Sequence, residues 1–143
     1  METNDRPALG AILETSLYVD DFDRSVAFYD RVLGLTHQTL GDRGASFAVA
    51  PGSVLLLWRR GGSRNDNQTY PGGMIPGHDG SGPLHIAFAI PTDAYDAWKD
   101  RLKTLGIPVR SEVNWARGGR SLYFDDPDGH VLELATPGVW PNY

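Results

Sequence analysis

Apolar residues at helical spacing mark a first helix over residues 22–33. The segment follows the alternating stretch ETSLYV and precedes Leu-Gly-Leu. Asp20 or Asp21 is placed to cap the free amides of the first turn, and Gly34 is placed to end the helix. The stripe predicts an amphipathic helix that packs one side against a sheet. Its members are Phe22, Val26, Tyr29 and Leu33.

The same plan recurs in the second half of the chain. The stretch HIAFAI is followed by PTDAYDAWKDRLKTLGI, where Thr92 is the expected helix cap and Gly106 the expected end. We therefore predict a second helix of the same kind. Its stripe consists of Tyr95, Trp98, Leu102 and Leu105.

Each helix is followed by two strands joined by a glycine-containing turn. The two halves align in sequence when Gly52 is matched to Gly129. This alignment pairs SFAVAPGSVLLLW, residues 46–58, with SLYFDDPDGHVLELA, residues 121–135. A weaker strand precedes each pair, near residues 36–39 and 109–113. Each half then has the order βαβββ. Because one such unit cannot cover both its helix and its sheet, we predict an α+β fold built from two paired modules.

The chain length fits one domain, which we expect to span residues 1–143. Its parts are predicted as a first module over about 11–58, a connecting loop over 59–83, a second module over about 84–136 and a tail over 137–143. The loop is dense in Gly, Asn, Asp and Pro and has no periodicity. This composition predicts a structureless segment, either a flap over a site or a plain linker.

Alternation along the strands divides the side chains between two faces. The repeat makes Glu14 equivalent to His85 and Leu56 equivalent to Glu133. We expect these positions to face away from the helices. The helix-facing set is Leu17, Val19, Leu55, Leu57, Ile86, Phe88, Ile90, Leu132 and Leu134, and the opposite set also includes Ser16, Tyr18, Ala87 and Val131.

Composition excludes several classes of function. The formal net charge of -5 and the lack of a Lys/Arg cluster argue against nucleic-acid binding. The absence of cysteine excludes disulfides and thiolate chemistry and agrees with a cytoplasmic location. The start METNDRPALG does not resemble a signal peptide, and no long apolar segment predicts membrane insertion.

Glu14, His85 and Glu133 are polar at repeat-equivalent positions and suit a divalent metal ion. Two carboxylates would balance the charge of Fe, Mn, Ni, Co, Zn or Mg, and three protein ligands would leave room for water and substrate. Other interpretations stay open. Each glutamate can be solvent-exposed, the histidine can be structural, and the three side chains can form a hydrogen-bonded polar patch.

The stretches LYVDDFDRSVAFYDRVLGL, GPLHIAFAI and SLYFDDPDGHVLEL together resemble the vicinal oxygen chelate superfamily. That superfamily includes glyoxalase I, bleomycin and fosfomycin resistance proteins and extradiol dioxygenases. The resemblance covers roughly residues 11–136 and implies paired modules whose mixed sheet curls around a metal. It also implies that the ligands occupy positions 14, 85 and 133.

The resemblance further implies a homodimer in which Glu14 of one chain joins His85 and Glu133 of the other. Two departures from the family pattern stand out. Glu14 takes a place where many members have histidine, and Leu56 takes one where glyoxalase I has glutamate. The ligand set of glyoxalase I is therefore incomplete in this chain.

Several further residues are candidates for the reaction chamber. Tyr123 is expected to pair near Leu132 or Glu133 across the hairpin, where it is either a catalytic group, like Glu133, or a half-buried sheet residue. The candidate substrate-binding residues are Tyr18, Trp58, Arg120 and Ser121. Tyr18 and Trp58 can instead meet another subunit, and Arg120 can instead lie at the surface. His78 and His130 are interpreted as structural or solvated.

These features together favour a metal-dependent enzyme that acts on a small molecule chelating the metal through vicinal oxygens. Its reaction would be that of a lyase, an isomerase or a dioxygenase of glyoxalase-like type. The alternative function is metal-free sequestration of a small molecule or antibiotic, as in the bleomycin resistance proteins. The partners predicted are a small-molecule substrate and a second copy of the chain.

Overall fold

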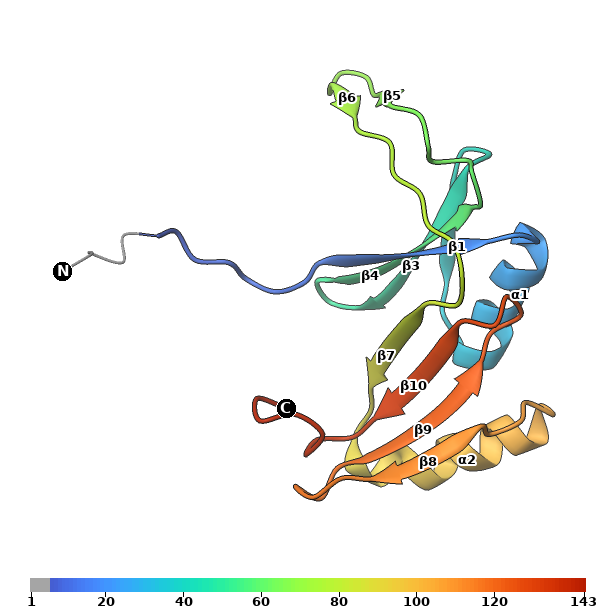
Figure 1. The fold of residues 1–143 in the computed structure, drawn as a ribbon, viewed down its shortest axis with the longest axis vertical. Coiled ribbons are helices and arrows are strands. Elements are labelled where there is room, and N and C mark those ends of the chain that lie inside the picture. The colour runs from blue at the N-terminus through green and yellow to red at the C-terminus, as the bar shows by residue number, and fades with distance from the viewer. Residues whose placement is uncertain (1–5) are drawn as a thin grey trace.

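The computed structural model describes residues 6–143 and contains two modules of the predicted order (Figure 1). The first module has one helix and four strands: β1 (Glu14–Val19), α1 (Phe22–Leu33), β2 (His37–Leu40), β3 (Gly44–Ala50) and β4 (Ser53–Arg59). The second module repeats this order with β7 (His85–Ala89), a 3-10 turn (Thr92–Ala94), α2 (Tyr95–Thr104), β8 (Ser111–Asn114), β9 (Arg120–Asp125) and β10 (Val131–Ala135). The fold is thus α+β, as predicted.

The two four-stranded sheets have the same topology and the same register. Their orders are β1-β4-β3-β2 and β7-β10-β9-β8, with the first pair of each sheet parallel and the others antiparallel. Glu14 lies opposite Val54 in one sheet, and His85 lies opposite Val131 in the other. Because the registers match, the equivalence inferred from the sequence repeat also holds in space.

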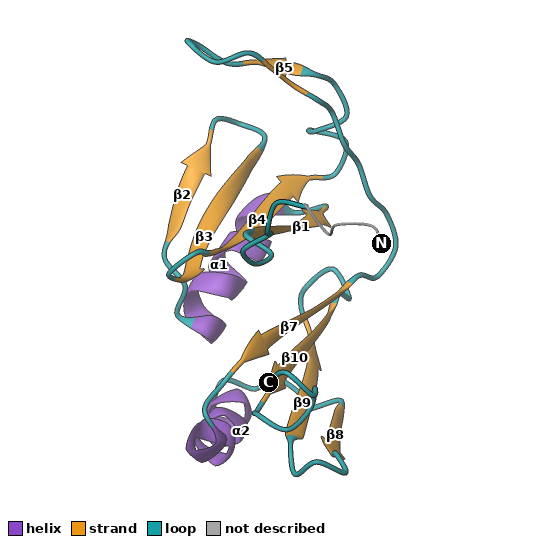
Figure 2. Cartoon of the chain, turned by 90° about the vertical axis from the view of Figure 1, so that its left-hand side faces the viewer, coloured by secondary structure: helices purple, strands orange, loops and turns teal. Residues whose placement is uncertain are grey.

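One helix accompanies each sheet (Figure 2), and a single cluster of buried apolar side chains spans both modules. The cluster contains the fully buried Tyr29, Phe47 and Leu102. The guanidinium of Arg101 in α2 donates to the carbonyls of Val32 and Arg31 at the end of α1, at 2.9 and 2.8 Å. The helices are therefore joined by polar contacts as well as by apolar packing.

The two helices begin differently. Asp21 caps α1, since its side chain accepts a hydrogen bond from the amide of Arg24 at 3.1 Å, and Gly34 ends this helix with a left-handed φ of 71°. The prediction that Thr92 caps the second helix is wrong. Pro91 holds an extended conformation, Thr92 begins a 3-10 turn, and α2 starts three residues later without a side-chain cap.

The turn DPDG and His130 join the two modules. Asp128 accepts hydrogen bonds from the hydroxyl of Ser25 and the amide of Asp20, both at 2.9 Å. The ring of His130, fully buried, meets the amide of Leu84 and the carbonyl of Tyr18 at 2.9 and 2.8 Å. The prediction of a structural role for His130 is confirmed.

The connecting loop is not structureless, contrary to the prediction. Two short strands, β5 (Asn67–Gln68) and β6 (Met74–Ile75), pair as a hairpin that stands off both sheets (Figure 1). The return limb of the loop is anchored, because the backbones of Ser63 and His78 are hydrogen-bonded at 2.7 Å. Strands of two residues each are too short to produce a periodic signal in the sequence.

No helix within residues 6–143 combines the length and the apolar character needed to cross a bilayer. At the other end of the chain, the hydroxyl of Tyr143 donates to the carbonyls of Ile90 and Ala135 at 3.2 and 2.9 Å. The tail therefore packs against the second module.

Candidate functional site

Glu133 lies on β10 with its carboxylate on the face away from the helices, and only 6% of the residue is exposed. Its oxygen Oε2 accepts a hydrogen bond from the hydroxyl of Ser121 at 2.5 Å. That hydroxyl in turn accepts from the indole Nε1 of Trp115 at 2.8 Å. A buried carboxylate is stabilised when such donors replace water.

His85 turns the edge of its ring toward this carboxylate. Its Nδ1 lies 2.8 Å from the carbonyl oxygen of Val131, so Nδ1 carries a proton and donates it. Its Nε2 lies 3.2 Å from Oε1 of Glu133. A neutral ring would therefore aim a lone pair at an acceptor oxygen. A proton on Nε2 or a cation shared by the two groups removes this conflict.

Tyr123 completes this half of the site. It pairs with Glu133 across the β9–β10 hairpin, as predicted, and its ring stacks on that of His85 with 6.2 Å between centroids. Burial raises the pKa of the Tyr123 phenol, and the charge of Glu133 raises it further. The phenol is therefore protonated at neutral pH and is available as a donor.

Glu14 belongs to a separate hollow of about 430 Å³ in the first module, which it lines together with Ser16, Trp58 and His78. The indole Nε1 of Trp58 donates to the hydroxyl of Ser16 at 3.1 Å. The remaining lining residues are Leu40, Arg43, Leu56, Ser63, Ile75 and Pro76. Two of the predicted site residues, Glu14 and Trp58, therefore share one cavity.

His78 was interpreted as structural or solvated, and its position beside Glu14 was not anticipated. Its Nδ1 lies 2.7 Å from the hydroxyl of Tyr18, and its ring meets Trp58 edge-on at 5.0 Å between centroids. Burial raises the pKa of Tyr18, and the carboxylate of Asp79 adds to this effect. His78 lies in the long loop that precedes the strand of His85, where no periodic pattern indicates the direction of its ring.

Arg120 does not lie with the other candidate residues. Its guanidinium sits 3.8 Å from the ring centroid of Tyr95 and 3.8 Å from a carboxylate oxygen of Asp96. Because side chains alternate along β9, Arg120 shares the helix-facing side with Leu122, whereas Ser121 faces Glu133. The expected substrate clamp by Arg120 is therefore replaced by a contact with α2.

Ser121 is placed on the predicted face but is fully buried. Its hydroxyl has the indole of Trp115 on one side and the carboxylate of Glu133 on the other. With both of these hydrogen bonds made inside the protein, the hydroxyl of Ser121 is satisfied without a ligand.

The structure brings two of the three predicted metal ligands together. Within the described part of the chain, no three His, Cys, Asp or Glu side chains lie close enough to hold one ion. His85 and Glu133 nevertheless fit as two of the ligands, because a ring nitrogen and a carboxylate oxygen lie 3.2 Å apart. The bond from Nδ1 of His85 to a carbonyl is the outer contact typical of a metal-binding histidine.

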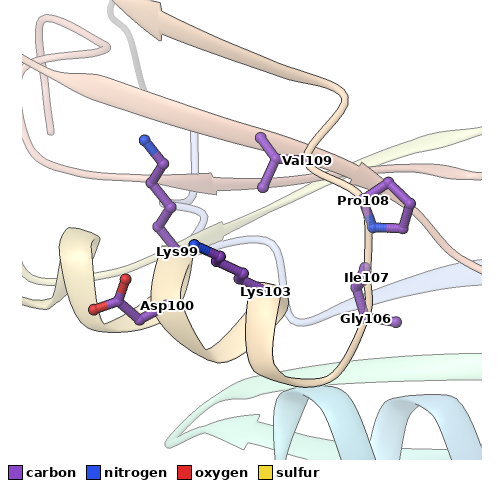
Figure 3. Close-up of a pocket in the computed structure, with 7 residues that line it drawn as sticks. All are labelled: Lys99, Asp100, Lys103, Gly106, Ile107, Pro108 and Val109. Atoms are coloured by element: carbon purple, nitrogen blue, oxygen red, sulfur yellow. The ribbon is translucent and has the colours of Figure 1, made fainter.

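Two other hollows contain none of these groups. One, of about 460 Å³, lies at the end of α2 between Lys99, Lys103 and Pro108 (Figure 3). Lys99 is paired there with Glu112 at 3.0 Å. The other, of about 500 Å³, is an apolar groove between the modules that includes Ile12 and Phe88. Neither offers the donor set of the His85–Glu133 pair.

Comparison with known proteins gives one consistent result. Residues 11–134 match the family described as the Glyoxalase/Bleomycin resistance protein/Dioxygenase superfamily. The chain is 33% identical over 120 residues to the metallothiol transferase FosB of Lysinibacillus sphaericus, covering 82% of this chain and 76% of that protein. It is 30% identical over 129 residues to the glutathione transferase FosA of Serratia marcescens, covering 88% and 80%.

A solved structure agrees with the sequence matches. The lactoylglutathione lyase of Agrobacterium tumefaciens superposes with a TM-score of 0.84 at 33% identity, over 94% of this chain and 99% of that one. The relatives thus carry the names of transferases and of a lyase on the same fold.

Proposed function

Because the chain belongs to the Glyoxalase/Bleomycin resistance protein/Dioxygenase superfamily, we propose that it is a divalent-metal-dependent enzyme acting on a small molecule with two neighbouring oxygens. The observation that carries this proposal is the approach of Nε2 of His85 to Oε1 of Glu133 at 3.2 Å. Two acceptors at this distance, one of them largely buried, are suited to a cation between them.

We propose His85 and Glu133 as two of the metal ligands, with Glu14 of a second copy as the third. Glu14 occupies the first-module position equivalent to His85, lies on the same kind of sheet face and borders a cavity. A site shared between two chains accounts for the absence of a three-ligand cluster among residues 6–143 of one chain. The functional unit is then a homodimer.

In this proposal the chain's own groups bind and orient the substrate. A bound divalent ion supplies Lewis acidity, which stabilises the oxyanion that develops on one of the chelating oxygens. Tyr123, kept protonated by burial and by the charge of Glu133, donates its phenol proton toward a substrate oxygen. Trp58 forms an aromatic wall of the Glu14 cavity, and Tyr18 supports this wall through its hydrogen bond with the lining residue His78. Glu14 or Glu133 moves the substrate proton.

Metal analysis tests this function directly. Protein prepared without a histidine tag is expected to contain about one divalent ion per chain, and His85→Ala and Glu133→Ala are expected to lose it. Thiol transfer and lactoylglutathione-type activity are then assayed with and without chelator, with Asp100→Ala as a surface control. Metal-free protein that binds no added divalent ion would overturn the proposal.

Mixing two inactive variants tests whether the site is shared. Glu14→Ala and Glu133→Ala chains are each expected to lack an intact site, but a mixed dimer regains one because each chain supplies what the other lacks. Recovery of metal binding on mixing, in about half of the mixed dimer's sites, supports the shared arrangement. No recovery from a mixture shown to form mixed dimers contradicts it.

Sequestration without metal is a second candidate, supported by the Trp58 cavity with its apolar lining of Leu40, Leu56 and Ile75. Titration of small aromatic ligands, followed by tryptophan fluorescence, distinguishes the two functions. Binding that is unchanged by chelator and by Glu133→Ala favours sequestration. Binding that requires both metal and Glu133 favours the enzyme.

A further inference from the structure

Trp115 lies outside the proposed ligand set but is linked to it by hydrogen bonds. Its indole Nε1 donates to Ser121 at 2.8 Å, and the Ser121 hydroxyl donates to Oε2 of Glu133 at 2.5 Å. The other oxygen of that carboxylate, Oε1, faces Nε2 of His85 at 3.2 Å. An unbroken path of polar contacts therefore leads from the turn after β8 to the His85–Glu133 pair.

The direction of these hydrogen bonds is fixed by chemistry. An indole N–H can only donate, whereas a serine hydroxyl has one proton to give and two lone pairs to receive with. Once Trp115 has filled a lone pair of Ser121, the serine proton is directed at the carboxylate of Glu133 at 2.5 Å, which is a stronger acceptor than the nearby phenol of Tyr123. Ser121 is fully buried, so no solvent molecule competes for that proton.

We propose that Trp115 is a positioning residue that acts through Ser121 to hold Glu133 with one oxygen occupied and the other free. This inference rests on the proposed metal site and adds a statement about its geometry. Because Oε2 is committed to Ser121, Glu133 binds a cation through Oε1 alone. Such outer contacts commonly change metal affinity by about 10- to 100-fold when they are removed.

The position of Trp115 is itself fixed by a tight turn. Its amide donates to the carbonyl of Gly119, and its carbonyl accepts from Gly118, at 2.8 and 2.9 Å. Gly118 has a left-handed φ of 93°, and a Cβ on Gly119 would meet the backbone of Gly138 at 2.4 Å. The glycines thus let the turn press against the tail. Trp115 is 39% exposed as a residue, so burial alone does not explain the orientation of its indole.

The test uses Co²⁺, whose affinity and visible absorption both report the ligand sphere. Trp115→Phe is expected to weaken Co²⁺ binding by about 10-fold or more and to alter the absorption, because the carboxylate of Glu133 is no longer held in one orientation. Ser121→Ala is expected to do the same. The double variant should bind as Ser121→Ala does, because Trp115 acts only through the serine.

Trp140→Phe is the matched control, since Trp140 is a 66% exposed tryptophan of the tail. It should leave the affinity and the spectrum unchanged. Wild-type affinity and spectrum in folded Trp115→Phe, or losses in the double variant that add, would overturn the proposal. Circular dichroism establishes that the variants are folded.

A metal-free measurement keeps this proposal separate from the proposed function. The indole N–H signal of Trp115 in the NMR spectrum should exchange slowly with solvent in the wild-type protein. Ser121→Ala should speed its exchange, and Glu133→Gln should shift it. If the protein binds no Co²⁺ but these responses occur, the metal function fails and the positioning of Glu133 stands. An indole signal indifferent to both substitutions rejects the positioning role.

Discussion

Nε2 of His130 lies 2.8 Å from the carbonyl oxygen of Tyr18, across the boundary between the two modules. Its Nδ1 accepts from the amide of Leu84 at 2.9 Å, so the proton of the neutral ring must be on Nε2 and is donated to Tyr18. Both ring nitrogens are satisfied in a fully buried position. One side chain thus pairs backbone groups of both modules.

Replacing His130 should destabilise the protein strongly. His130→Ala removes the partner of the part-buried amide of Leu84, leaves the carbonyl of Tyr18 with only a long contact of 3.4 Å from Arg60, and opens a cavity. We expect the free energy of unfolding to fall by about 2–5 kcal/mol in urea denaturation. His37→Ala is the control, because His37 makes a half-exposed polar contact with Asp30 whose loss should cost less than about 1 kcal/mol. Equal losses in the two variants would contradict the role of His130.

Asp126 should make stability depend on pH. Its Oδ2 accepts from the hydroxyl of Tyr29 at 2.8 Å, and burial raises the pKa of its carboxyl, which the Tyr29 hydrogen bond only partly offsets. The folded state therefore holds the proton more tightly than the unfolded state. The stability that this proton contributes is complete below the ordinary Asp pKa and is lost as the pH rises through the raised value.

Asp126→Asn removes this titration while keeping an oxygen for the amides of Asp128 and His130. Relative to this variant, wild-type protein should gain stability as the pH falls from 7 to about 4.5, toward the ordinary Asp range. Urea denaturation of both proteins at each pH measures the difference. The prediction would be refuted if the difference in free energy of unfolding between the two proteins did not change with pH. It would also be refuted if the wild type lost stability relative to Asp126→Asn as the pH fell.

Arg120→Ala should leave Co²⁺ affinity unchanged. The guanidinium lies on Tyr95 at the helix side of β9, away from the carboxylate of Glu133. Loss of its contact with the tyrosine ring should lower the free energy of unfolding by only about 1 kcal/mol. Ser121→Ala, at the neighbouring position and measured in the same titration, should weaken Co²⁺ binding. Loss of metal binding in Arg120→Ala would contradict this prediction and show that Arg120 contributes to the site.

Leu56→Glu should strengthen metal binding in the dimer. Leu56 is the first-module equivalent of Glu133 and borders the cavity of Glu14. A third carboxylate near the cation adds charge and an oxygen ligand, so Co²⁺ affinity should rise severalfold. Leu56→Gln, which has the same shape without the charge, is the matched control. Equal affinity in the wild type and in Leu56→Glu would show that this position lies too far from the ion.

The sequence predicted the fold well because the repeat specifies register. Gly52 and Gly129 both hold left-handed φ values, 71° and 79°, at corresponding turns, and a periodic strand on each side then fixes every face. The repeat similarly singled out His85 and Glu133, which the structure brings together. The position of a residue along its strand was therefore sufficient to infer the face of the sheet on which its side chain lies.

Residues outside the periodic segments were not predictable in the same way. Trp115 and His78 lie in a turn and a loop, where direction depends on backbone conformation and not on alternation. Arg120 was treated as preceding its strand, whereas it is the first residue of β9 and so shares the alternation of Leu122. The 3-10 turn at Thr92 follows the extended Pro91, and the apolar pattern of the helix does not indicate this local change of backbone conformation.

The hairpin formed by β5 and β6 contributes no strand to either four-stranded sheet, yet Ile75 at its base borders the Glu14 cavity. Exchange of the hairpin for a longer or shorter one would leave the strands that carry His85 and Glu133 in register. The fold can therefore acquire new ligand selectivity through insertions in a single loop. In a natural lineage or in the laboratory, the lining of the Glu14 cavity can diversify there while the proposed ligand positions are kept.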